Sequence, residues 1–265
     1  SRSPQAPFRT STLQQAAANR LGFTARRTMQ TAQRLYEGVD FGEGPIGLIT
    51  YMRTDSTSLA AEALTQIREY IGNTYGAQNV PPAPRTYANK QANAQEAHEA
   101  IRPTSLDHPP SKLRNVLKPD QFRLYQIIWE RFVACQMAHA QWDVATVLIE
   151  GGADRARPCT FKATGRTLVF DGFYKAPGVP PAADTATLPR LAERQRVNPF
   201  AIEVDQKFTS PPARYSEASL IKTLESEGIG RPSTYASIIQ VIQDRKYVEQ
   251  IDRRFYSTDL GEVVT

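Results

Sequence analysis

Apolar residues recur at helical spacing through most of the first half of the chain. Leu13, Ala17 and Leu21 lie about one helical turn apart and follow Ser and Thr residues typical of helix N-caps, which predicts a helix over residues 10–21. Gly22 is its expected end. The same spacing predicts further helices over residues 25–36, from about 59 to between 70 and 75, and 119–137.

The pattern becomes β-like after residue 141. Short apolar or alternating runs predict strands over residues 144–149, 159–163, 167–174 and 200–204. We expect the second and third of these strands to pair as a hairpin across Gly165 and Arg166. Residues 177–189, rich in Pro and Ala, predict an exposed loop.

The last sixty residues return to helical spacing and then end in a hairpin pattern. Ser216 is a candidate cap for one helix, a Gly-Ile-Gly turn follows, and a second helix is expected from residue 232 or 233 to 244. Strands over 247–251 and 255–257 complete a winged-helix order. The chain is therefore predicted to be a multidomain α+β protein, with a mainly helical domain at 1–141, a β-rich domain at 142–207 and a winged-helix-like domain, expected to be truncated, at 208–265.

The composition indicates which kinds of partner and setting suit the chain. The chain has 32 Lys and Arg against 27 Asp and Glu, a formal charge of +5, which suits a polyanion such as nucleic acid. No apolar run approaches the length needed to span a bilayer, and no signal-peptide pattern is present. Cys135 and Cys159 form no Cys-x-x-Cys pair, so we expect no zinc site and a reducing cytoplasmic setting.

The sharpest chemical signal is Gly-Leu-Ile-Thr-Tyr-Met-Arg-Thr-Asp-Ser-Thr at residues 47–57. In an extended segment Tyr51 and Arg53 point to the same face. A guanidinium beside a phenol favours the phenolate and binds phosphate oxygens, so this pair suits attack on a phosphodiester. The alternative is a buried strand before a capped helix, with Tyr51 in the core.

This segment resembles the active-site segment of type IA DNA topoisomerases, and Met52 favours the bacterial topoisomerase I branch over topoisomerase III. Three other ordered segments resemble the same family: Ser-Thr-Leu-Gln-Gln at 11–15, Gln-Glu-Ala-His-Glu-Ala-Ile-Arg-Pro at 95–103, and Glu-Ala-Ser-Leu at 217–220 followed by Gly-Ile-Gly-Arg-Pro-Ser-Thr-Tyr-Ala at 228–236. Together they span most of the chain.

The resemblance implies that Tyr51 attacks a DNA phosphate to form a 5′-phosphotyrosine link, which is later reversed without ATP. It implies that Arg53 binds the scissile phosphate. Thr54 and Asp55 are expected to support the site, by capping the following helix or by orienting Arg53.

The second motif contains His98, which the resemblance places against the phosphate or the cleaved strand. A structural role is the alternative for a single histidine. Glu99 is a candidate partner for the imidazole. Arg102 is either a phosphate contact or a member of an ion pair, and the sequence leaves both open.

The third motif has glycines before a helix start, where backbone N–H groups can face a phosphate. Arg231, Ser233 and Thr234 are the expected contacts to the backbone of single-stranded DNA. An ordinary capped turn between two helices is the alternative.

The family also needs an acidic Toprim domain that binds Mg²⁺, and no Asp-x-Asp cluster of that kind occurs in this sequence. We therefore expect a core fragment that binds no metal itself and is inactive alone. The resemblance further implies strands that form an arch around a central hole, a DNA partner, no membrane partner, a monomer, and a cytoplasmic, nucleoid-associated location.

Two other functions compete with this interpretation. A non-catalytic winged-helix DNA-binding protein would need no nucleophile at residue 51. A tyrosine recombinase also uses Tyr and Arg on DNA, but it places its tyrosine near the C-terminus, whereas Tyr51 lies early in the chain.

Overall fold

The structure, a computed structural model, describes residues 1–41, 44–87, 98–151, 159–179, 187–198 and 200–265. Helices dominate the first half, and the strands form three separate antiparallel pairs. The helical elements are α1 (Thr10–Leu21), α2 (Ala25–Glu37), α3 (Ala61–Tyr75), η1 (Ala77–Asn79), α4 (Pro110–Leu113), α5 (Pro119–Cys135), η2 (Gly172–Lys175), α6 (Glu217–Ser226), α7 (Tyr235–Asp244) and α8 (Asp259–Val264). The strands are β1 (Val39–Asp40), β2 (Pro45–Ile46), β3 (Gln141–Gly151), β4 (Cys159–Phe170), β5 (Val248–Ile251) and β6 (Arg254–Ser257). This mixture confirms the predicted α+β content.

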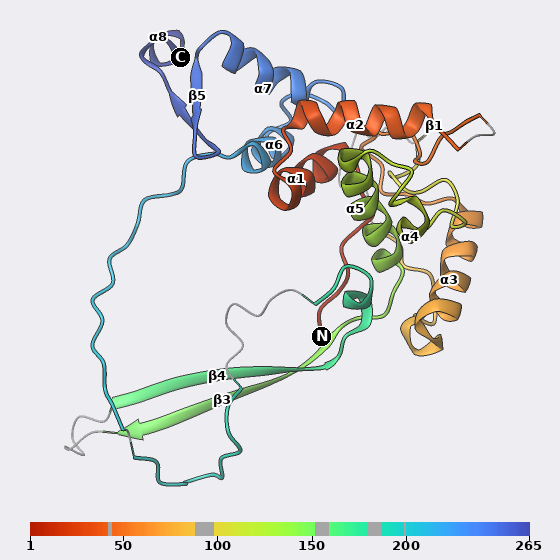
Figure 1. Ribbon diagram of the computed structural model, residues 1–265. Coiled ribbons are helices and arrows are strands. Elements are labelled where there is room, and N and C mark those ends of the chain that lie inside the picture. The colour runs from red at the N-terminus through yellow and green to blue at the C-terminus, as the bar shows by residue number, and fades with distance from the viewer. Residues whose placement is uncertain (42–43, 88–97, 152–158, 180–186, 199) are drawn as a thin grey trace.

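The first helices share one core. Figure 1 shows α1, α2 and α5 packed together, with α3 and α4 beside α5. The inward stripes of these amphipathic helices meet there, and Leu13, Leu35, Ile67 and Ile128 are completely buried. No helix in the described ranges is long and apolar enough to cross a membrane.

Local signals set the ends of the first two helices, as the sequence predicted. Gly22 adopts a left-handed conformation with φ of 69°, which ends α1. The Thr24 hydroxyl accepts a hydrogen bond from the Arg27 N–H at 3.1 Å and caps α2. The predicted bounds of α1 are confirmed, and α2 runs one residue further than predicted.

β3 and β4 form one long antiparallel hairpin, which corrects the predicted hairpin across Gly165 and Arg166. Residues 159–170 are a single strand, and within it Gly165 lies opposite Ala145 of β3. A glycine inside a strand does not by itself force a turn, and here the ladder continues through it. The chain instead reverses between β3 and β4, and residues 172–174 of the predicted strand belong to η2.

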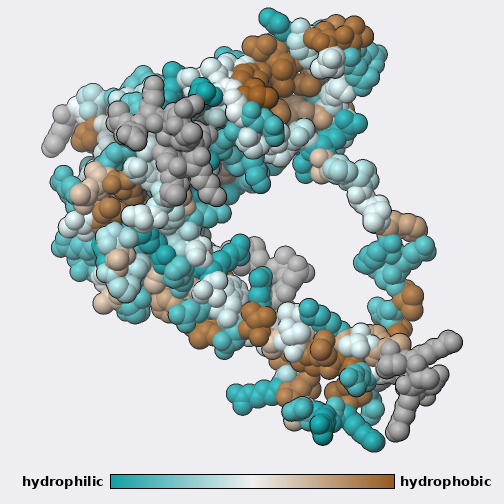
Figure 2. Space-filling model, turned by 180° about the vertical axis from the view of Figure 1, so that it is seen from behind, coloured by the Kyte–Doolittle hydropathy of each residue, from teal (hydrophilic) through white to brown (hydrophobic). Residues whose placement is uncertain are grey.

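The predicted strand over residues 200–204 is wrong. Apolar and polar residues alternate over this segment as they do in a strand. Its Phe200 and Val204 are almost fully exposed, however, and no described strand pairs with the segment. An alternating pattern makes a strand only where a neighbour completes its hydrogen bonds. The extended segment over 200–216 leads back to α6, and it leaves an open space between itself, the β3–β4 hairpin and the helices (Figures 1 and 2).

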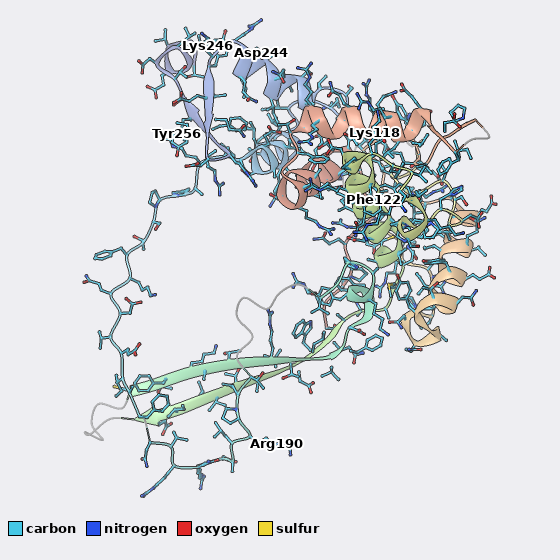
Figure 3. The ribbon with its side chains drawn as sticks, viewed as in Figure 1. Lys118, Phe122, Arg190, Asp244, Lys246 and Tyr256 are labelled. Atoms are coloured by element: carbon cyan, nitrogen blue, oxygen red, sulfur yellow. The ribbon has the colours of Figure 1, made fainter. Side chains whose placement is uncertain are left out.

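The end of the chain forms a second, smaller cluster. Ile221 of α6, Ile239 of α7 and Phe255 of β6 bury their side chains against one another and against Ala25 of α2. The Arg214 guanidinium lies 4.5 Å from the centre of the Tyr256 ring, labelled in Figure 3, so the extended segment docks on β6. The order helix, turn, helix, hairpin follows the sequence pattern, and α8 was not predicted.

Two glutamates of α6 join this cluster to the first core. One Glu217 carboxylate oxygen accepts the Ala25 N–H at 2.6 Å and so caps α2 from another element. The Glu225 carboxylate pairs with Arg9 at 3.0 Å and accepts the Ser11 hydroxyl hydrogen at 2.6 Å. Since Ile221 lies between them on the same buried face, α6 is held against α1 and α2 by charged and apolar contacts together.

The capping contact of Glu217 should be visible in stability measurements. We expect Glu217→Ala to lower the free energy of unfolding at neutral pH by about 1–3 kcal/mol, because the buried Ala25 N–H loses its acceptor. Glu217→Gln keeps an acceptor and should cost less. Urea unfolding of both variants checks this, with Glu227→Gln, an exposed residue at the end of the same helix, as the control.

The same contact predicts a pH dependence. Burial raises the pKa of Glu217, and the Ala25 N–H opposes that rise. The folded protein then binds the carboxyl proton of Glu217 more tightly than the unfolded chain does. Proton binding therefore stabilises the folded state below the ordinary carboxyl pKa, and this stabilisation is lost as pH rises through the raised pKa. Relative to Glu217→Gln, the wild type should gain stability as pH falls from neutral toward about 4. Parallel pH curves for the two proteins would contradict this.

Candidate active site

The segment that carries Tyr51 alternates buried and outward residues without forming a strand. Leu48 and Met52 are buried, Tyr51 is half-buried and Arg53 is exposed. The chain bends here, and its only described β-pairing is the isolated bridge of Ile49 with residue 103, so the alternative of a buried strand is not what forms. Because the buried residues anchor the segment, its intervening polar residues face outward.

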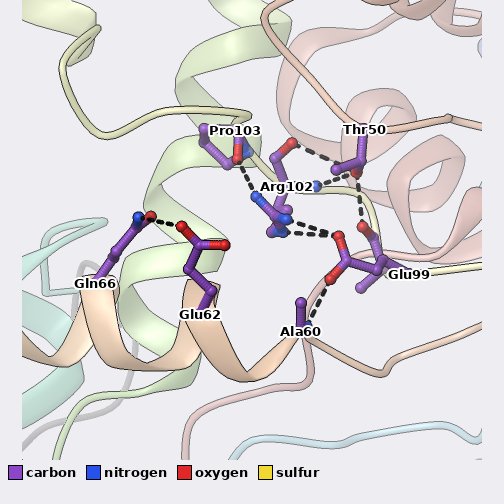
Figure 4. Close-up of polar contacts among 8 residues, drawn as sticks. Thr50, Ala60, Glu62, Gln66, Glu99, Arg102 and Pro103 are labelled. Atoms are coloured by element: carbon purple, nitrogen blue, oxygen red, sulfur yellow. Dashed lines mark hydrogen bonds and ion pairs between the residues drawn. The ribbon is translucent and has the colours of Figure 1, made fainter.

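Residues 100–104 fix one side of this segment. The Thr50 N–H donates to the Arg102 carbonyl at 2.9 Å, and the Thr50 hydroxyl donates to the Ala100 carbonyl at 2.7 Å (Figure 4). The Thr104 N–H donates to the Leu48 carbonyl at 3.1 Å. The second motif predicted from the sequence is thus the physical support of the first.

The start of α1 fixes the other side through one buried hydroxyl. Thr10 is fully buried, and its hydroxyl donates to the Met52 carbonyl at 2.7 Å and accepts the Thr54 N–H at 2.9 Å. Its own N–H donates to the Thr54 carbonyl at 2.9 Å. Thr54 therefore belongs to the scaffold that holds the backbone around Arg53.

Of the two roles expected for Thr54 and Asp55, capping of the following helix does not occur, because the N-cap of α3 is Ala60. The Thr54 hydroxyl accepts the Ser56 N–H at 3.0 Å in a local turn, and α3 begins only at residue 61. The cap comes from a distant residue instead: the Ala60 N–H donates to the Glu99 carboxylate at 2.6 Å (Figure 4).

Two aromatic rings flank the Tyr51 ring. The centre of the His98 ring lies 5.6 Å from it, tilted by 41°, and the centre of the Tyr36 ring lies 5.4 Å from it in an edge-to-face arrangement at 67°. Both distances are in the range where aromatic rings attract one another. The predicted neighbourhood of Tyr51 and His98 is therefore present in the structure.

Tyr51 lines a polar cleft that the last part of the chain completes. The cleft has a volume of about 380 Å³. Its walls combine the Tyr51 segment, His98 and the turn before α7; the lining residues are Tyr51, Arg53, Thr54, Asp55, His98, Arg231, Pro232 and Ser233. Two arginines, an imidazole and two hydroxyls around one tyrosine form a site suited to a phosphate group.

A second, longer groove starts at the same place and runs between α2 and α7. It has a volume of about 780 Å³ and shares Tyr51, Arg53, Pro232 and Ser233 with the cleft. Its other walls are mostly polar side chains of the two helices, among them Arg26, Gln30, Gln33, Arg34, Ser237 and Gln240. Tyr51 and Arg53 thus lie where the two cavities meet.

Arg102 and Glu99 do not line the cleft. The Arg102 guanidinium pairs with the Glu99 carboxylate at 2.7 Å and donates to the Pro103 carbonyl at 3.0 Å (Figure 4). With its carboxylate engaged by Arg102 and Ala60, Glu99 makes no described bond to the His98 imidazole. Of the two alternatives for Arg102, the geometry favours the ion pair.

The turn before α7 differs from the expected phosphate cradle. α7 begins at residue 235, so the Thr234 N–H donates to the Arg231 carbonyl at 2.8 Å within the turn. The Thr234 hydroxyl accepts the Arg231 N–H at 2.8 Å, and Thr234 does not line the cleft. Arg231 and Ser233 line the cleft, whereas the described hydrogen bonds of Thr234 lie within the turn, and its role as a DNA contact stays a prediction.

The polar stripe of α2 was missed by the sequence analysis. Arg26, Gln30, Gln33 and Glu37 recur at helical spacing on the face opposite the buried one, and all line the groove. The spacing of these polar residues is visible in the sequence, but an ordinary solvent-exposed helix face has the same spacing. The position of α7 in the structure is what makes this stripe a wall of the groove. Residues 95–97 of the second motif lie outside the described residues.

Comparison with known proteins identifies the family of this chain. A family model described as DNA topoisomerase matches residues 1–265, the whole chain. The chain belongs to the DNA topoisomerase family. The DNA topoisomerase 1 of Rickettsia felis is 50% identical over the whole chain, and that of Salmonella typhimurium is 49% identical over 99% of it. The chain spans 34% and 29% of these relatives, about a third of their length.

A solved structure agrees with this topoisomerase assignment. Full-length topoisomerase I from Thermotoga maritima matches with a TM-score of 0.86 and 38% sequence identity. The match covers 99% of this chain and 42% of that one. The similarity thus extends over the helical part, the β3–β4 hairpin and the C-terminal cluster together.

The buried Thr10 hydroxyl generates a test of how the Tyr51 segment is supported. We expect Thr10→Val to lower the free energy of unfolding by about 1–3 kcal/mol, because the buried Thr54 N–H loses its only described acceptor. Thr10→Ser keeps the hydroxyl and should cost less. Thermal unfolding of both variants measures the difference; a loss in Thr10→Ser as large as that in Thr10→Val would contradict a dominant contribution of the hydroxyl.

Proposed function

We propose that this chain is the core of a type IA DNA topoisomerase, which cleaves one DNA strand through Tyr51 and relaxes negatively supercoiled DNA without ATP. The observation that carries the proposal is the cleft in which Tyr51, Arg53, His98 and Arg231 meet, within a chain of the topoisomerase family.

In this proposal the Tyr51 oxygen attacks a backbone phosphorus atom and loses its proton, a 5′-phosphotyrosine bond forms, and the 3′-oxygen leaves as a hydroxyl. The covalent bond replaces the phosphodiester, so attack by the 3′-hydroxyl reverses the step and needs no other energy source. Guanidinium groups at the site stabilise the charge that builds on the phosphate as the phenol oxygen attacks. Arg53 is the nearest such group along the chain.

We further propose that single-stranded DNA enters along the groove between α2 and α7. Its polar lining with Arg26 and Arg34 suits a phosphate backbone, and it ends at Tyr51. In the three-domain division, residues 1–141 carry the nucleophile, 142–207 form the arch and 208–265 bind DNA. We propose that the enzyme acts as a monomer in the cytoplasm, on the nucleoid.

The Mg²⁺ that the family implies does not fit the residues described. No three His, Cys, Asp or Glu side chains in the described ranges lie close enough to hold a metal ion. We therefore place the metal in a Toprim domain supplied by the rest of the protein, and no step above passes through it. In this proposal the chain alone binds DNA weakly and does not cleave it.

The decisive experiment is a cleavage assay on end-labelled single-stranded DNA. We expect a covalent DNA–protein band when the chain is combined with a separately made Toprim domain and Mg²⁺, and no band with the chain alone. Tyr51→Phe should abolish the band, because phenylalanine has no nucleophilic oxygen.

The outcome also decides between the candidate functions. A non-catalytic DNA-binding protein would bind DNA equally well with Tyr51→Phe and would give no band in any mixture. A band blocked at the 3′ end of the DNA would indicate a recombinase-like enzyme. Relaxation of supercoiled plasmid by the chain alone would contradict the need for a separate metal domain.

The two arginines of the motifs should differ in DNA binding. Arg53 lines the cleft, so Arg53→Ala should weaken binding to single-stranded DNA and reduce the slope of log K against log salt by about 0.7. Arg102 is engaged by Glu99, so Arg102→Ala should leave the slope unchanged and lower thermal stability. Fluorescence anisotropy at several salt concentrations measures the slope for each variant. A smaller slope for Arg102→Ala than for the wild type would indicate that Arg102 contacts a phosphate after all.

A further inference from the structure

Tyr51 has an aromatic neighbour that belongs to none of the motifs. Tyr36, in the last turn of α2, meets the Tyr51 ring edge to face, with 5.4 Å between ring centres. His98 lies on Tyr51 as well, at 5.6 Å. The Tyr51 ring is therefore in contact with one ring from α2 and one from the second motif.

The surroundings of Tyr36 argue against two common roles of a tyrosine, packing in the core and binding a phosphate. Its side chain is 41% exposed, so it is not a core residue. It lines neither the cleft nor the groove, as far as the described residues define them, so it is not placed to bind the phosphate backbone there. The described contact of the Tyr36 ring is its edge-to-face packing against the Tyr51 ring.

The backbone holds Tyr36 at a fixed distance from the Tyr51 segment. The Leu48 N–H donates to the Leu35 carbonyl at 2.8 Å, which ties the end of α2 to that segment. A Cβ atom on Gly47 would lie 2.6 Å from the Tyr36 carbonyl oxygen, so only glycine allows this approach. Two backbone contacts in addition to the ring pair thus make Tyr36 a rigid neighbour.

We propose that Tyr36 is a positioning residue for the nucleophile, and this inference rests on the proposed function of Tyr51. The Tyr51 ring is half-buried and needs to present its oxygen to a phosphorus atom in one orientation. A ring packed edge to face against it restricts the rotation of its side chain, while the Tyr36 hydroxyl has no part in the step. The rate of DNA cleavage then depends on the ring of Tyr36 and not on its oxygen.

The first arm of the test observes Tyr51 in the chain itself. Fluorotyrosine is incorporated, and the ¹⁹F NMR signal of Tyr51 is identified by its absence in Tyr51→Phe. We expect Tyr36→Leu to move this signal toward the value of the unfolded chain and Tyr36→Phe to leave it near the wild-type value. An unchanged signal in Tyr36→Leu would overturn the proposal.

The second arm separates rate from binding in the enzyme assembled with its Toprim domain and Mg²⁺. At saturating single-stranded DNA, Tyr36→Leu should slow formation of the covalent adduct by between about twofold and tenfold, the worth of one aromatic pair, with Kd for DNA unchanged. Tyr36→Phe should restore the wild-type rate. Tyr70→Leu, which removes edge-to-face pairs with Tyr75 and Trp129 at a residue that lines neither the cleft nor the groove, is the matched control and should not slow it.

Three results would overturn the proposal: a wild-type rate in Tyr36→Leu, a loss in Tyr36→Phe as large as in Tyr36→Leu, or a rise in Kd that matches the fall in rate. Failure of the proposed function looks different. In that case the wild type forms no adduct, or Tyr51→Phe still forms one, and the NMR arm alone decides whether Tyr36 orients Tyr51.

Discussion

The contact of α6 with α1 and α2 is the constraint on which the candidate site depends. Glu217 caps α2 at Ala25, and Glu225 binds Arg9 and Ser11 at the start of α1. Together with the packing of α7 on α2, this contact brings the turn before α7 to the Tyr51 segment, which lies about 180 residues earlier in the sequence. Without it the cleft would lose Arg231 and Ser233, and the groove would lose one of its two walls.

The chemistry of this contact suits an interface that opens. Removing carboxylates from water offsets much of what their hydrogen bonds contribute, so the polar part of this interface gains little net free energy. The raised pKa of Glu217 reflects that cost. In the proposed function, a strand that passes through the open space seen in Figure 2 needs the two walls of the cleft to separate, and the connection through β3, β4 and the extended segment keeps them in one chain.

The Tyr51 segment itself is held by more hydrogen bonds from neighbouring elements. Thr10 binds it from α1, residues 100–104 bind it from the second motif, and Leu48 binds the end of α2. These partners all belong to the first core. The proposed reaction therefore has a rigid half, which positions Tyr51, and a docked half, which supplies further cationic and hydroxyl groups.

Elements whose causes are local could be predicted from the order of the amino acids. Amphipathic spacing and caps predicted α1 and α2 almost to the residue, and the motif around Tyr51 predicted the family and the proximity of Tyr51, Arg53 and His98. The partner of each polar group, in contrast, depends on the folded arrangement of the helices. Glu99 caps α3 and binds Arg102, Gly165 continues a ladder, and residues 200–204 find no described strand. The physical reason is that hydrogen bonds and ion pairs form between whichever groups the packing of distant helices brings together, and residue spacing along the chain carries no information about that distance.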